Sequence, residues 1–303
     1  MRHLLPYKYI EEIAKAGSIR KAAETLAITP SALNRRLLTI EDELGVSIFE
    51  RMAVGVRLNT AGEILLEHIR TQMSDLERVK SQIADLSGQR RGNVSIACSP
   101  ELMSGYLPMQ VYAYQSEFPG VQFKVDLTFR EEVEGALSDH SSDVAFVFNP
   151  TKLVDFQSAL TVKQTLYCVM KSDHPLSKKK NLRLYECAEF PLLLQNQNWG
   201  IRQILNQSAL RLGINLRPSL QSDSLQFLNN RERAPDQLSF DLEINLENNN
   251  QYGDYVCVSL NEMDVPAGQL LVGQLKGRTL SVAAARFLEQ LTTQMVSRFE
   301  VID

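Results

Sequence analysis

The sequence lacks the features of a membrane or secreted protein. It has no run of roughly 18 apolar residues, the length that a membrane-spanning helix needs. Glu11 and Glu12 interrupt the first apolar segment, so a signal peptide is not expected. The four cysteines are widely spaced and form no C-x-x-C pair, which favours reduced thiols over a disulfide framework or a zinc site. We therefore expect a cytoplasmic protein that does not contact a membrane.

The sequence also lacks the short motifs of common enzyme classes. It contains no G-x-S-x-G, H-E-x-x-H, P-loop or G-x-G-x-x-G pattern. Its four histidines, His3, His68, His140 and His174, are scattered along the chain. No metal or cofactor is therefore expected, and an enzyme is the disfavoured class. The formal net charge of -4 gives no general attraction to nucleic acid, so any DNA-binding surface has to be local.

Residues 18–44 have the pattern of two short helices joined by a tight turn. Thr29 and Pro30 suit the N-cap and first position of the second helix. Apolar residues recur on one face of that helix, whereas Ser31 and Arg35 project from the opposite face. This pattern predicts a helix-turn-helix whose second helix enters the major groove of DNA. On this stretch alone, an ordinary amphipathic helical hairpin is the alternative.

A short β-hairpin is expected directly after the second helix, because SIFER and VRL flank the turn at residues 53–55. Arg51 and Arg57 lie at its ends, where a wing would meet phosphates or a minor groove. The alternative is two solvated arginines on an ordinary hairpin. Arg35 is the expected base reader. The predicted DNA contacts are Ser18, Arg20, Lys21, Thr29, Pro30, Ser31, Asn34, Arg35, Arg36, Arg51 and Arg57.

A long helix is predicted over residues 60–88, with Thr60 and Glu63 in capping-box spacing. Its narrow apolar stripe on an otherwise charged helix suits a coiled-coil partner, and packing against its own chain is the alternative. The predicted dimerisation residues are Leu66, Ile69, Met73, Leu76, Ile83 and Leu86. The Gly-bounded residues 89–92 are the expected hinge between this helix and the remainder of the chain.

From residue 93 onward, strands alternate with helices, which predicts an α/β fold class. DVAFVF at 143–148 is nearly continuous in apolar residues, as in a parallel strand buried on both faces. LSFDLEINL at 238–246 alternates over nine residues and predicts a single strand. The expected domains are 1–59, 60–88 and 93–303, the last divided into lobe I (about 93–162 with 268–303) and lobe II (about 163–267).

The N-terminal third resembles the LysR-type transcriptional regulators. The residues that carry the resemblance are Gly17-Ser18, Ala22-Ala23, Leu26, PSALNR at 30–35, Glu41-x-Glu43-Leu44-Gly45, Phe49-x-Arg51 and LNTAG at 58–62. The resemblance implies a bacterial winged helix-turn-helix, a dimerising linker helix and a two-lobed effector domain like periplasmic binding proteins. It also implies a homotetramer built from two dimers that binds double-stranded promoter DNA and contacts RNA polymerase.

The chain departs from the family pattern at three places. Pro30 stands where Gln is common, and Leu38 stands where Lys or Arg is frequent. A base preference therefore does not transfer from the family. Residues 229–250 replace a Gly-rich turn and an apolar segment of the second lobe. The cleft wall contributed by that segment is expected to differ from the family's.

A small organic anion between the two lobes is the predicted effector. Ser99 follows one strand and precedes a helix, and Thr128 and Phe148 end the next two strands at the edge where α/β folds bind ligands. Free amides at a helix start favour an anion, although Glu101 in the same turn already complements that dipole. The predicted effector contacts are Ser99, Pro100, Met103, Thr128, Phe148, Gln195, Gln197, Asn198, Trp199, Arg202 and Ser224.

The sequence thus favours a regulator whose promoter binding responds to a small molecule. At the level of residues, the alternative for the cleft is a simple helix cap at Ser99 and an ordinary surface loop at 195–199. At the level of the protein, the alternative is a small-molecule-binding transport or sensor module without regulatory DNA binding. The long α/β region argues against a purely architectural DNA-binding protein, which would need no such domain.

Overall fold

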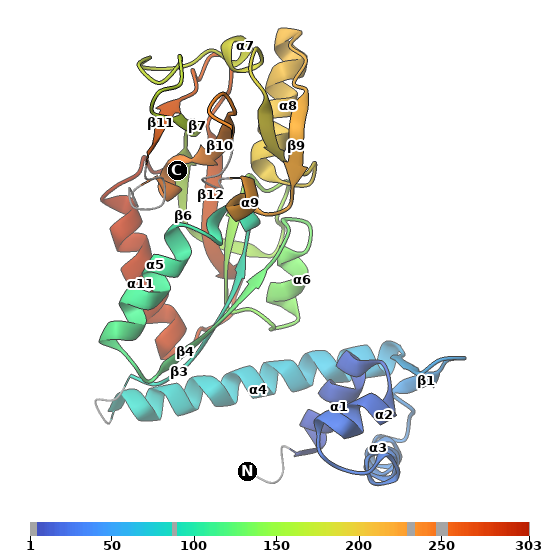
Figure 1. The fold of residues 1–303 in the computed structure, drawn as a ribbon. Coiled ribbons are helices and arrows are strands. Elements are labelled where there is room, and N and C mark those ends of the chain that lie inside the picture. The colour runs from blue at the N-terminus through green and yellow to red at the C-terminus, as the bar shows by residue number, and fades with distance from the viewer. Residues whose placement is uncertain (1–4, 87–89, 229–233, 247–253, 303) are drawn as a thin grey trace. The chain divides into compact units, whose positions relative to one another are not determined.

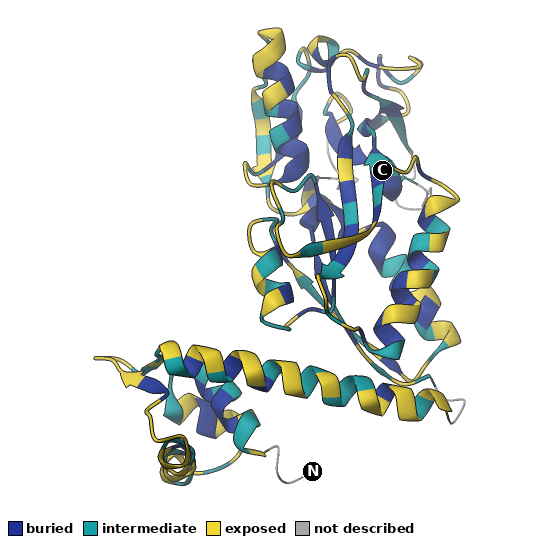
Figure 2. Cartoon of the chain, turned by 180° about the vertical axis from the view of Figure 1, so that it is seen from behind, coloured by how far each residue is buried: buried dark blue, intermediate teal, exposed yellow. Residues whose placement is uncertain are grey.

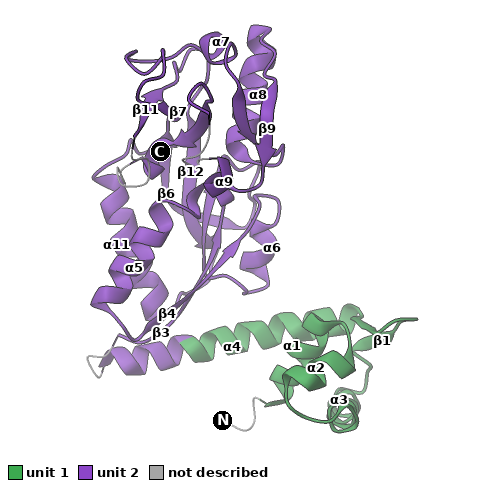
Figure 3. Cartoon of the chain, in the orientation of Figure 1, with its two compact units in different colours: residues 1–77 green, residues 78–303 purple. Residues whose placement is uncertain are grey.

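The computed structural model describes residues 5–86, 90–228, 234–246 and 254–302. The chain divides into two compact units, Met1–Glu77 and Arg78–Asp303, which Figure 3 colours separately. None of the helices in the described ranges has the length and apolar character needed to cross a membrane. Each unit has its own buried core, and each is described separately below.

Three helices build the core of the first unit, and the second and third are the pair predicted from residues 18–44. They are α1 (Leu5–Ala16), α2 (Ile19–Thr25) and α3 (Pro30–Leu44). The core residues include Tyr9, Ile10, Ile13, Ala22, Ala23, Leu33 and Leu37. The small side chains on α2 allow the other helices to approach closely. This core leaves the opposite face of α3 exposed to solvent.

Both helices of the helix-turn-helix have a side-chain N-cap, and the cap predicted at Thr29 is confirmed. The Ser18 hydroxyl accepts a hydrogen bond from Lys21 N (3.5 Å), and the Thr29 hydroxyl accepts one from Ala32 N (3.3 Å). Such caps satisfy backbone N–H groups that have no partner inside the helix. Gly45 ends α3 in the left-handed conformation with φ of 70°, which glycine adopts without steric cost.

The predicted hairpin is also present, as β1 (Phe49–Arg51) paired antiparallel with β2 (Val56–Leu58). Val56 N donates to the carbonyl oxygen of Gly17 (2.9 Å), which ties the hairpin to the turn between α1 and α2. Gly55 has φ of +85°, and a Cβ there would lie 2.2 Å from Gly17 O. Glycine is therefore required at this position for the hairpin to pack against the turn at Gly17.

Helix α4 (Thr60–Leu86) begins differently from the prediction. The Asn59 side chain, rather than a Thr60–Glu63 capping box, accepts from Gly62 N (2.9 Å). The correction has a physical basis, because Asn is as good an N-cap as Thr and stands one residue earlier. Residues 87 and 88 of the predicted helix lie outside the described residues.

The apolar stripe of α4 has two parts. Ile69 belongs to the core of the winged helix-turn-helix, and Leu66 is also buried within the single chain. Toward the end of α4, Ile83 is 60% exposed and Leu86 is 89% exposed. Figure 2 shows the mixture of buried and exposed residues along this helix. Leu66 and Ile69 of the stripe are thus buried within their own chain, whereas Ile83 and Leu86 at its end are exposed to solvent.

Lobe I of the second unit is a five-stranded sheet in the order β4-β3-β5-β12-β6. The strands are β3 (Gly92–Cys98), β4 (Val121–Leu127), β5 (Val144–Phe148), β6 (Phe156–Gln164) and β12 (Gly268–Leu275). Helices α5 (Tyr106–Glu117) and α11 (Val282–Val296) lie on one face, and α6 (Val133–Ser138) lies on the other (Figure 1). Every residue of β5 is buried, and β5 pairs parallel with β3 as predicted, although its other neighbour β12 runs antiparallel.

Lobe II contains two small sheets, one in the order β10-β7-β11 and one of β8 with β9. Its strands are β7 (Leu166–Lys171), β8 (Leu192–Gln195), β9 (Pro218–Ser222), β10 (Ser239–Leu242) and β11 (Tyr255–Ser259). Its helices are α7 (Leu184–Cys187), α8 (Gly200–Leu212) and α9 (Leu225–Leu228). The four cysteines of the chain are free thiols.

Strand β6 is followed directly by β7, because the chain leaves the sheet of lobe I at Thr165 and enters that of lobe II. One strand prediction in the second unit needs correction. The nine-residue strand predicted at 238–246 is only β10, followed by the 3-10 helix η3 (Glu243–Asn245). All four residues of β10 are buried, including Asp241, so its alternating pattern does not mark a solvent-facing side. Residues 229–233 and 247–250 of the atypical segment lie outside the described residues.

Candidate DNA interface and effector cleft

The outer face of α3 carries the side chains predicted to read DNA. Ser31 and Arg35 are exposed, and Asn34 is half-buried. The Thr29 and Ser31 hydroxyls lie 3.2 Å apart at the start of the helix. Leu38 is 47% exposed one turn further on, so an apolar group stands on the same outer surface. This face offers a hydroxyl, an amide, a guanidinium and an apolar group to a groove.

Three of the predicted DNA-binding arginines already have intramolecular partners. Arg20 pairs with Glu24 one turn along α2, with an Nε–Oε1 distance of 3.5 Å. Arg57 pairs across the hairpin with Glu50 at 3.3 Å. The Arg36 guanidinium lies over the ring of Tyr9, 4.8 Å from its centroid. The pairs of Arg20 and Arg57 are exposed, so they contribute little to stability and dissociate readily.

The remaining predicted cations are different. Lys21, Arg35 and Arg51 are exposed, and their side chains form no hydrogen bond or ion pair with the residues that the structure describes. They come from α2, α3 and the hairpin respectively. Unpaired cations contribute more to phosphate binding than paired ones, because no existing ion pair has to be broken first. Lys21 and Arg36, both predicted DNA contacts, therefore differ: the Arg36 guanidinium lies over Tyr9, whereas the Lys21 side chain is unpaired among the described residues.

At the second site, three strands of lobe I end together. Ser99 follows β3, and its Oγ accepts from Phe148 N (3.0 Å) at the end of β5. Thr128 follows β4, and its N–H donates to Cys98 O (2.9 Å). The prediction that Ser99, Thr128 and Phe148 share one edge of the sheet is confirmed. Ser99 is buried and its side chain caps no helix, so the helix-cap alternative fails at this residue.

The polar loop of lobe II divides into a buried base and an exposed tip. Gln195, Trp199 and Arg202 are buried, whereas Gln197 and Asn198 are exposed. Among the described residues, neither Gln195 Oε1 nor Trp199 Nε1 has a hydrogen-bond partner. Buried polar atoms are normally paired, so both atoms are suited to a further partner. This loop is therefore more than an ordinary surface turn.

Arg202 is the buried cation of this loop. Its Nη1 donates to Gln195 O (3.2 Å), and its Nε donates to Asn206 Oδ1 (2.9 Å). No carboxylate among the described residues forms an ion pair with it. Burial lowers the pKa of the guanidinium from its usual value. A buried cation held only by neutral groups adds positive potential to this part of lobe II.

Glu101 joins the two lobes. It lies in the 3-10 helix η2 (Pro100–Leu102) of lobe I, is 1% exposed, and its Oε1 accepts from Gly200 N (2.6 Å) at the start of α8. Burial raises the pKa of the Glu101 carboxyl to about 7, and the negative charge of Asp241 adds to the rise. Backbone N–H groups of residues 101, 200 and 201 oppose the rise because they stabilise the charged form.

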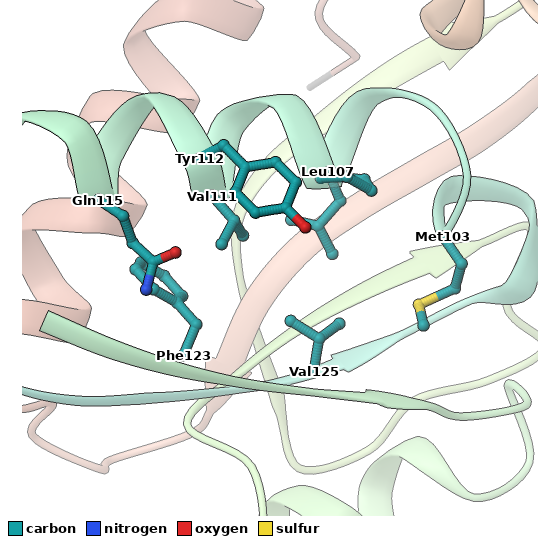
Figure 4. A pocket seen from close by; sticks show the side chains of 8 residues that line it. Met103, Leu107, Val111, Tyr112, Gln115, Phe123 and Val125 are labelled. Atoms are coloured by element: carbon teal, nitrogen blue, oxygen red, sulfur yellow. The ribbon is translucent and has the colours of Figure 1, made fainter.

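Of the remaining predicted effector residues, Pro100 lies next to Glu101, whereas Met103 and Ser224 have other surroundings. Met103 lines a groove of about 280 Å³ between α5 and β4, and none of the lining residues of this groove comes from lobe II (Figure 4). Ser224 is exposed and precedes α9, and its Oγ accepts from Phe227 N (3.2 Å) of that helix. Pro100 is buried in η2 beside Ser99.

The sequence prediction missed three residues of the junction: Gly200, Asp241 and Asn245. Asn245 Nδ2 donates to Glu101 O (2.7 Å) and to Asp241 Oδ1 (2.7 Å). The sequence indicates only that Asp241 and Asn245 lie in the segment 229–250, which departs from the family pattern. That segment was expected to differ, but its contact with residue 101 has no local sequence signature.

Two family models match the chain over both units. The LysR substrate binding domain matches residues 87–296. The bacterial regulatory helix-turn-helix protein, lysR family, matches residues 6–63. Together they account for the helix-turn-helix, the hairpin, and both lobes of the α/β domain.

Individual proteins agree with these matches. The chain is 24% identical over 221 residues to the HTH-type transcriptional activator CmpR of Synechocystis sp., covering 72% of both chains. It is 26% identical over 207 residues to the transcriptional dual regulator GltC of Bacillus subtilis, covering 68% of this chain and 69% of that one. A full-length OxyR variant from Pseudomonas aeruginosa has the same fold, with a TM-score of 0.67, 17% identity, and coverage of 96% and 94%. Full-length CbnR complexed with its target DNA gives a TM-score of 0.63, 17% identity, and coverage of 96% and 99%.

Proposed function

Because the chain belongs to the LysR family of DNA-binding transcriptional regulators, which are not enzymes, we propose that it reads promoter DNA with the outer face of α3 and its wing. We propose further that a small organic effector between the two lobes modulates this binding. The observation that carries the first part is the pairing pattern of the cations. Arg35 stands exposed and unpaired, among the described residues, on a helix whose opposite face is buried.

Arg35 is the proposed base reader, and Lys21 and Arg51 are the proposed phosphate contacts. A guanidinium can donate two hydrogen bonds to guanine O6 and N7, and Ser31 and Asn34 are within one helical turn of it. Lys21 on α2 and Arg51 on the hairpin flank α3 in the chain order of a winged helix-turn-helix. The exposed Leu38 favours an apolar contact, such as a thymine methyl, at its position.

An organic anion remains the proposed effector class. The supporting observations are the buried cation Arg202, the donor atom Trp199 Nε1, and the N-terminus of α8. Each of these favours negative charge or a hydrogen-bond acceptor. Ser99 and Thr128 from lobe I supply hydroxyl groups at the edge that faces a ligand in folds of this class.

We propose that the protein works as a homo-oligomer, a dimer of dimers, that contacts RNA polymerase at its promoters. The support for dimerisation in this chain is the open part of the apolar stripe on α4, where Val79, Ile83 and Leu86 recur at helical spacing and are exposed. Leu66 and Ile69 are already buried in their own chain, so the proposed seam centres on the later residues.

Selection of genomic fragments by the full chain, followed by footprinting, tests the proposed function. The expected result is protection of discrete promoter sites at physiological salt, because base contacts add to the phosphate term. A thermal-shift screen of small carboxylates and aromatic acids, followed by repetition of the footprint with each hit, tests the effector. Binding of ligands without sequence-selective protection of DNA would support the transport or sensor module instead.

A further inference from the structure

Glu101 occupies the place where an anionic effector would be expected to bind. Its carboxylate comes from lobe I and accepts hydrogen bonds from backbone N–H groups at the first turn of α8 in lobe II. The N-terminus of a 13-residue helix attracts negative charge, because its first N–H groups have no partner within the helix. Glu101 supplies that charge internally.

Two glycines allow the lobes to approach closely around this contact. A Cβ at Gly200 would lie 2.6 Å from Phe148 Cδ1 and 3.1 Å from Glu101 Oε1. A Cβ at Gly268 would lie 2.3 Å from Phe148 Cζ. The Phe148 ring of lobe I is therefore seated against two glycines, and α8 reaches the Glu101 carboxylate only because residue 200 has no side chain.

A second contact holds the backbone of the same loop. Asn245 of lobe II donates to Glu101 O, and its Oδ1 accepts from Tyr106 N (3.3 Å). A Cβ at Gly105 would lie 2.4 Å from Asn245 Oδ1, so the loop between η2 and α5 also fits closely around this amide. Lobe II thus contacts loop 99–106 at two points: α8 binds the Glu101 carboxylate, and Asn245 binds the backbone of the loop.

We propose that Glu101 is a specificity-determining residue of the interlobe cleft, whose carboxylate acts as a built-in substitute for the anionic group of the effector. An anionic effector binds at the start of α8 only by displacing Glu101, and displacement releases one of the two points at which lobe II holds loop 99–106. This inference rests on the proposed function for the identity of the site, but its test does not need DNA. It explains how effector binding changes the contact between the lobes.

The competition has a defined chemical consequence. An external carboxylate and the ionised Glu101 cannot both accept from the same N–H groups, and their charges repel each other. Only molecules in which the site is open can bind a ligand. The apparent affinity is therefore the intrinsic affinity multiplied by the fraction of open molecules. Asp241 from β10 and Cys98 from β3 are the titratable neighbours that interact with Glu101. The negative charge of Asp241 adds to the preference for an uncharged Glu101, whereas the Cys98 thiol is uncharged because burial raises its pKa well above the usual value. Acidification therefore favours entry of an anion.

Chemical rescue in the full-length protein tests the inference. The probes are acetate and benzoate, titrated against the wild type, Glu101→Ala and Glu101→Gln, with chloride at equal ionic strength as the salt control. Hydrogen exchange of the amides at residues 200 and 201 is followed by mass spectrometry, and probe affinity is followed by calorimetry. We expect these amides to be protected in the wild type, to exchange faster in Glu101→Ala, and to regain protection when acetate fills the vacated position.

The expected affinity of Glu101→Ala for the carboxylate probes is at least about 10-fold higher than that of the wild type at pH 8, because no internal group competes. Glu101→Gln keeps an acceptor for Gly200 N without the charge and is expected to lie between the two. If Glu101→Ala does not fold, Glu101→Gln provides the test. The inference is overturned if Glu101→Gln binds benzoate with the same affinity as the wild type at both pH 6 and pH 8. Unchanged protection and affinity in a folded Glu101→Ala would do the same.

Glu134→Ala is the matched control. Glu134 Oε1 also accepts from backbone N–H groups, those of Val154 and Asp155, but all of these residues lie in lobe I. We expect this variant to bind the probes like the wild type and to leave exchange at residue 200 unchanged. Rescue of Glu101→Ala by acetate would support the inference even if no effector altered DNA binding, so its outcome is separate from that of the proposed function.

Discussion

Lys21, Arg35 and Arg51 in the winged helix-turn-helix are exposed and unpaired among the described residues, whereas Glu101 between the lobes is buried and held by backbone N–H groups. The first arrangement leaves charge available for a highly charged polymer, and neutralisation takes place when DNA binds. In the second, the Glu101 carboxylate already occupies backbone N–H groups of α8, so a ligand has to replace an existing interaction. The proposed DNA surface therefore needs no rearrangement before binding, whereas the proposed effector site between the lobes opens only when the Glu101 carboxylate is displaced.

The largest expected effect comes from removing the buried charge. The pKa of Glu101 rises from 4.5 to about 7 on folding, so the native state holds more protons than the unfolded state between these values. Stability contributed by this group is therefore full at low pH, falls as the pH rises through this window, and stays reduced above it. Glu101→Gln is expected to be more stable than the wild type at pH 8 by as much as about 3 kcal/mol.

Urea denaturation of both proteins at pH 5.5 and pH 8 measures this difference. The gap between Glu101→Gln and the wild type should widen as the pH rises, since only the wild type has the buried carboxyl. A gap that is constant with pH would show that the carboxyl titrates as in the unfolded chain. In that case the comparison between a buried and an exposed set of charges would lose its electrostatic basis.

Gly200→Ala tests the steric side of the same junction. The added Cβ would lie 2.6 Å from Phe148 Cδ1, so either the ring or α8 has to shift. We expect a loss of about 1–3 kcal/mol in the free energy of unfolding, as for other overpacked sites. Gly135→Ala in α6 is the control, because a Cβ there meets nothing within 4 Å. Equal stability of the two variants would contradict the close contact between the lobes.

Arg35→Ala tests the exposed side of the comparison. Loss of a base-reading guanidinium is expected to weaken binding to a selected operator by about 1–3 kcal/mol and to leave binding to random DNA nearly unchanged. Arg286→Ala is the control, because Arg286 is exposed, pairs with Glu289 and lies in α11 of the second unit, outside the predicted DNA contacts. Competition gel shifts with both duplexes measure the two losses. If Arg35→Ala weakens both duplexes equally, Arg35 contacts phosphate rather than a base.

Ser99→Ala and Thr128→Ala are expected to have the smallest effects. Each removes one hydroxyl from the strand edge of lobe I, and a single hydrogen bond contributes about 1 kcal/mol to ligand affinity. Calorimetry with the best carboxylate from the thermal-shift screen measures the change, and Ser141→Ala, an exposed serine between α6 and β5, is the control. Affinities that stay unchanged in both variants would move the effector away from this edge.

The sequence predicted the first unit nearly completely, because its signals are local. Caps at Ser18 and Thr29, the apolar face with Leu33 and Leu37, and the hairpin around Gly55 each lie within a few residues of their partners. Even there, Asn59 rather than Thr60 caps α4, since adjacent residues with similar capping preference cannot be separated by pattern alone.

The junction between the lobes was less predictable, because its contacts join residues far apart in the chain. Glu101 meets Gly200 and Asn245 only after two lobes have folded and met. The short strand β10 was predicted too long for a related reason: alternation over nine residues predicted one strand, yet the chain enters η3 after Leu242, and Asn245 of η3 bonds the buried Asp241. Periodicity reports burial of apolar groups and carries no information about buried polar pairs.

A fluorescence anisotropy titration of the full-length protein with a selected promoter duplex and a shuffled duplex, at physiological salt, tests the central claim most directly. The exposed outer face of α3, which carries Arg35, predicts that the promoter duplex binds about 10³-fold or more tightly than the shuffled one. It also predicts that Arg35→Ala reduces this preference. Equal affinity for the two duplexes, with the same steep salt dependence, would contradict sequence-selective regulation by this protein.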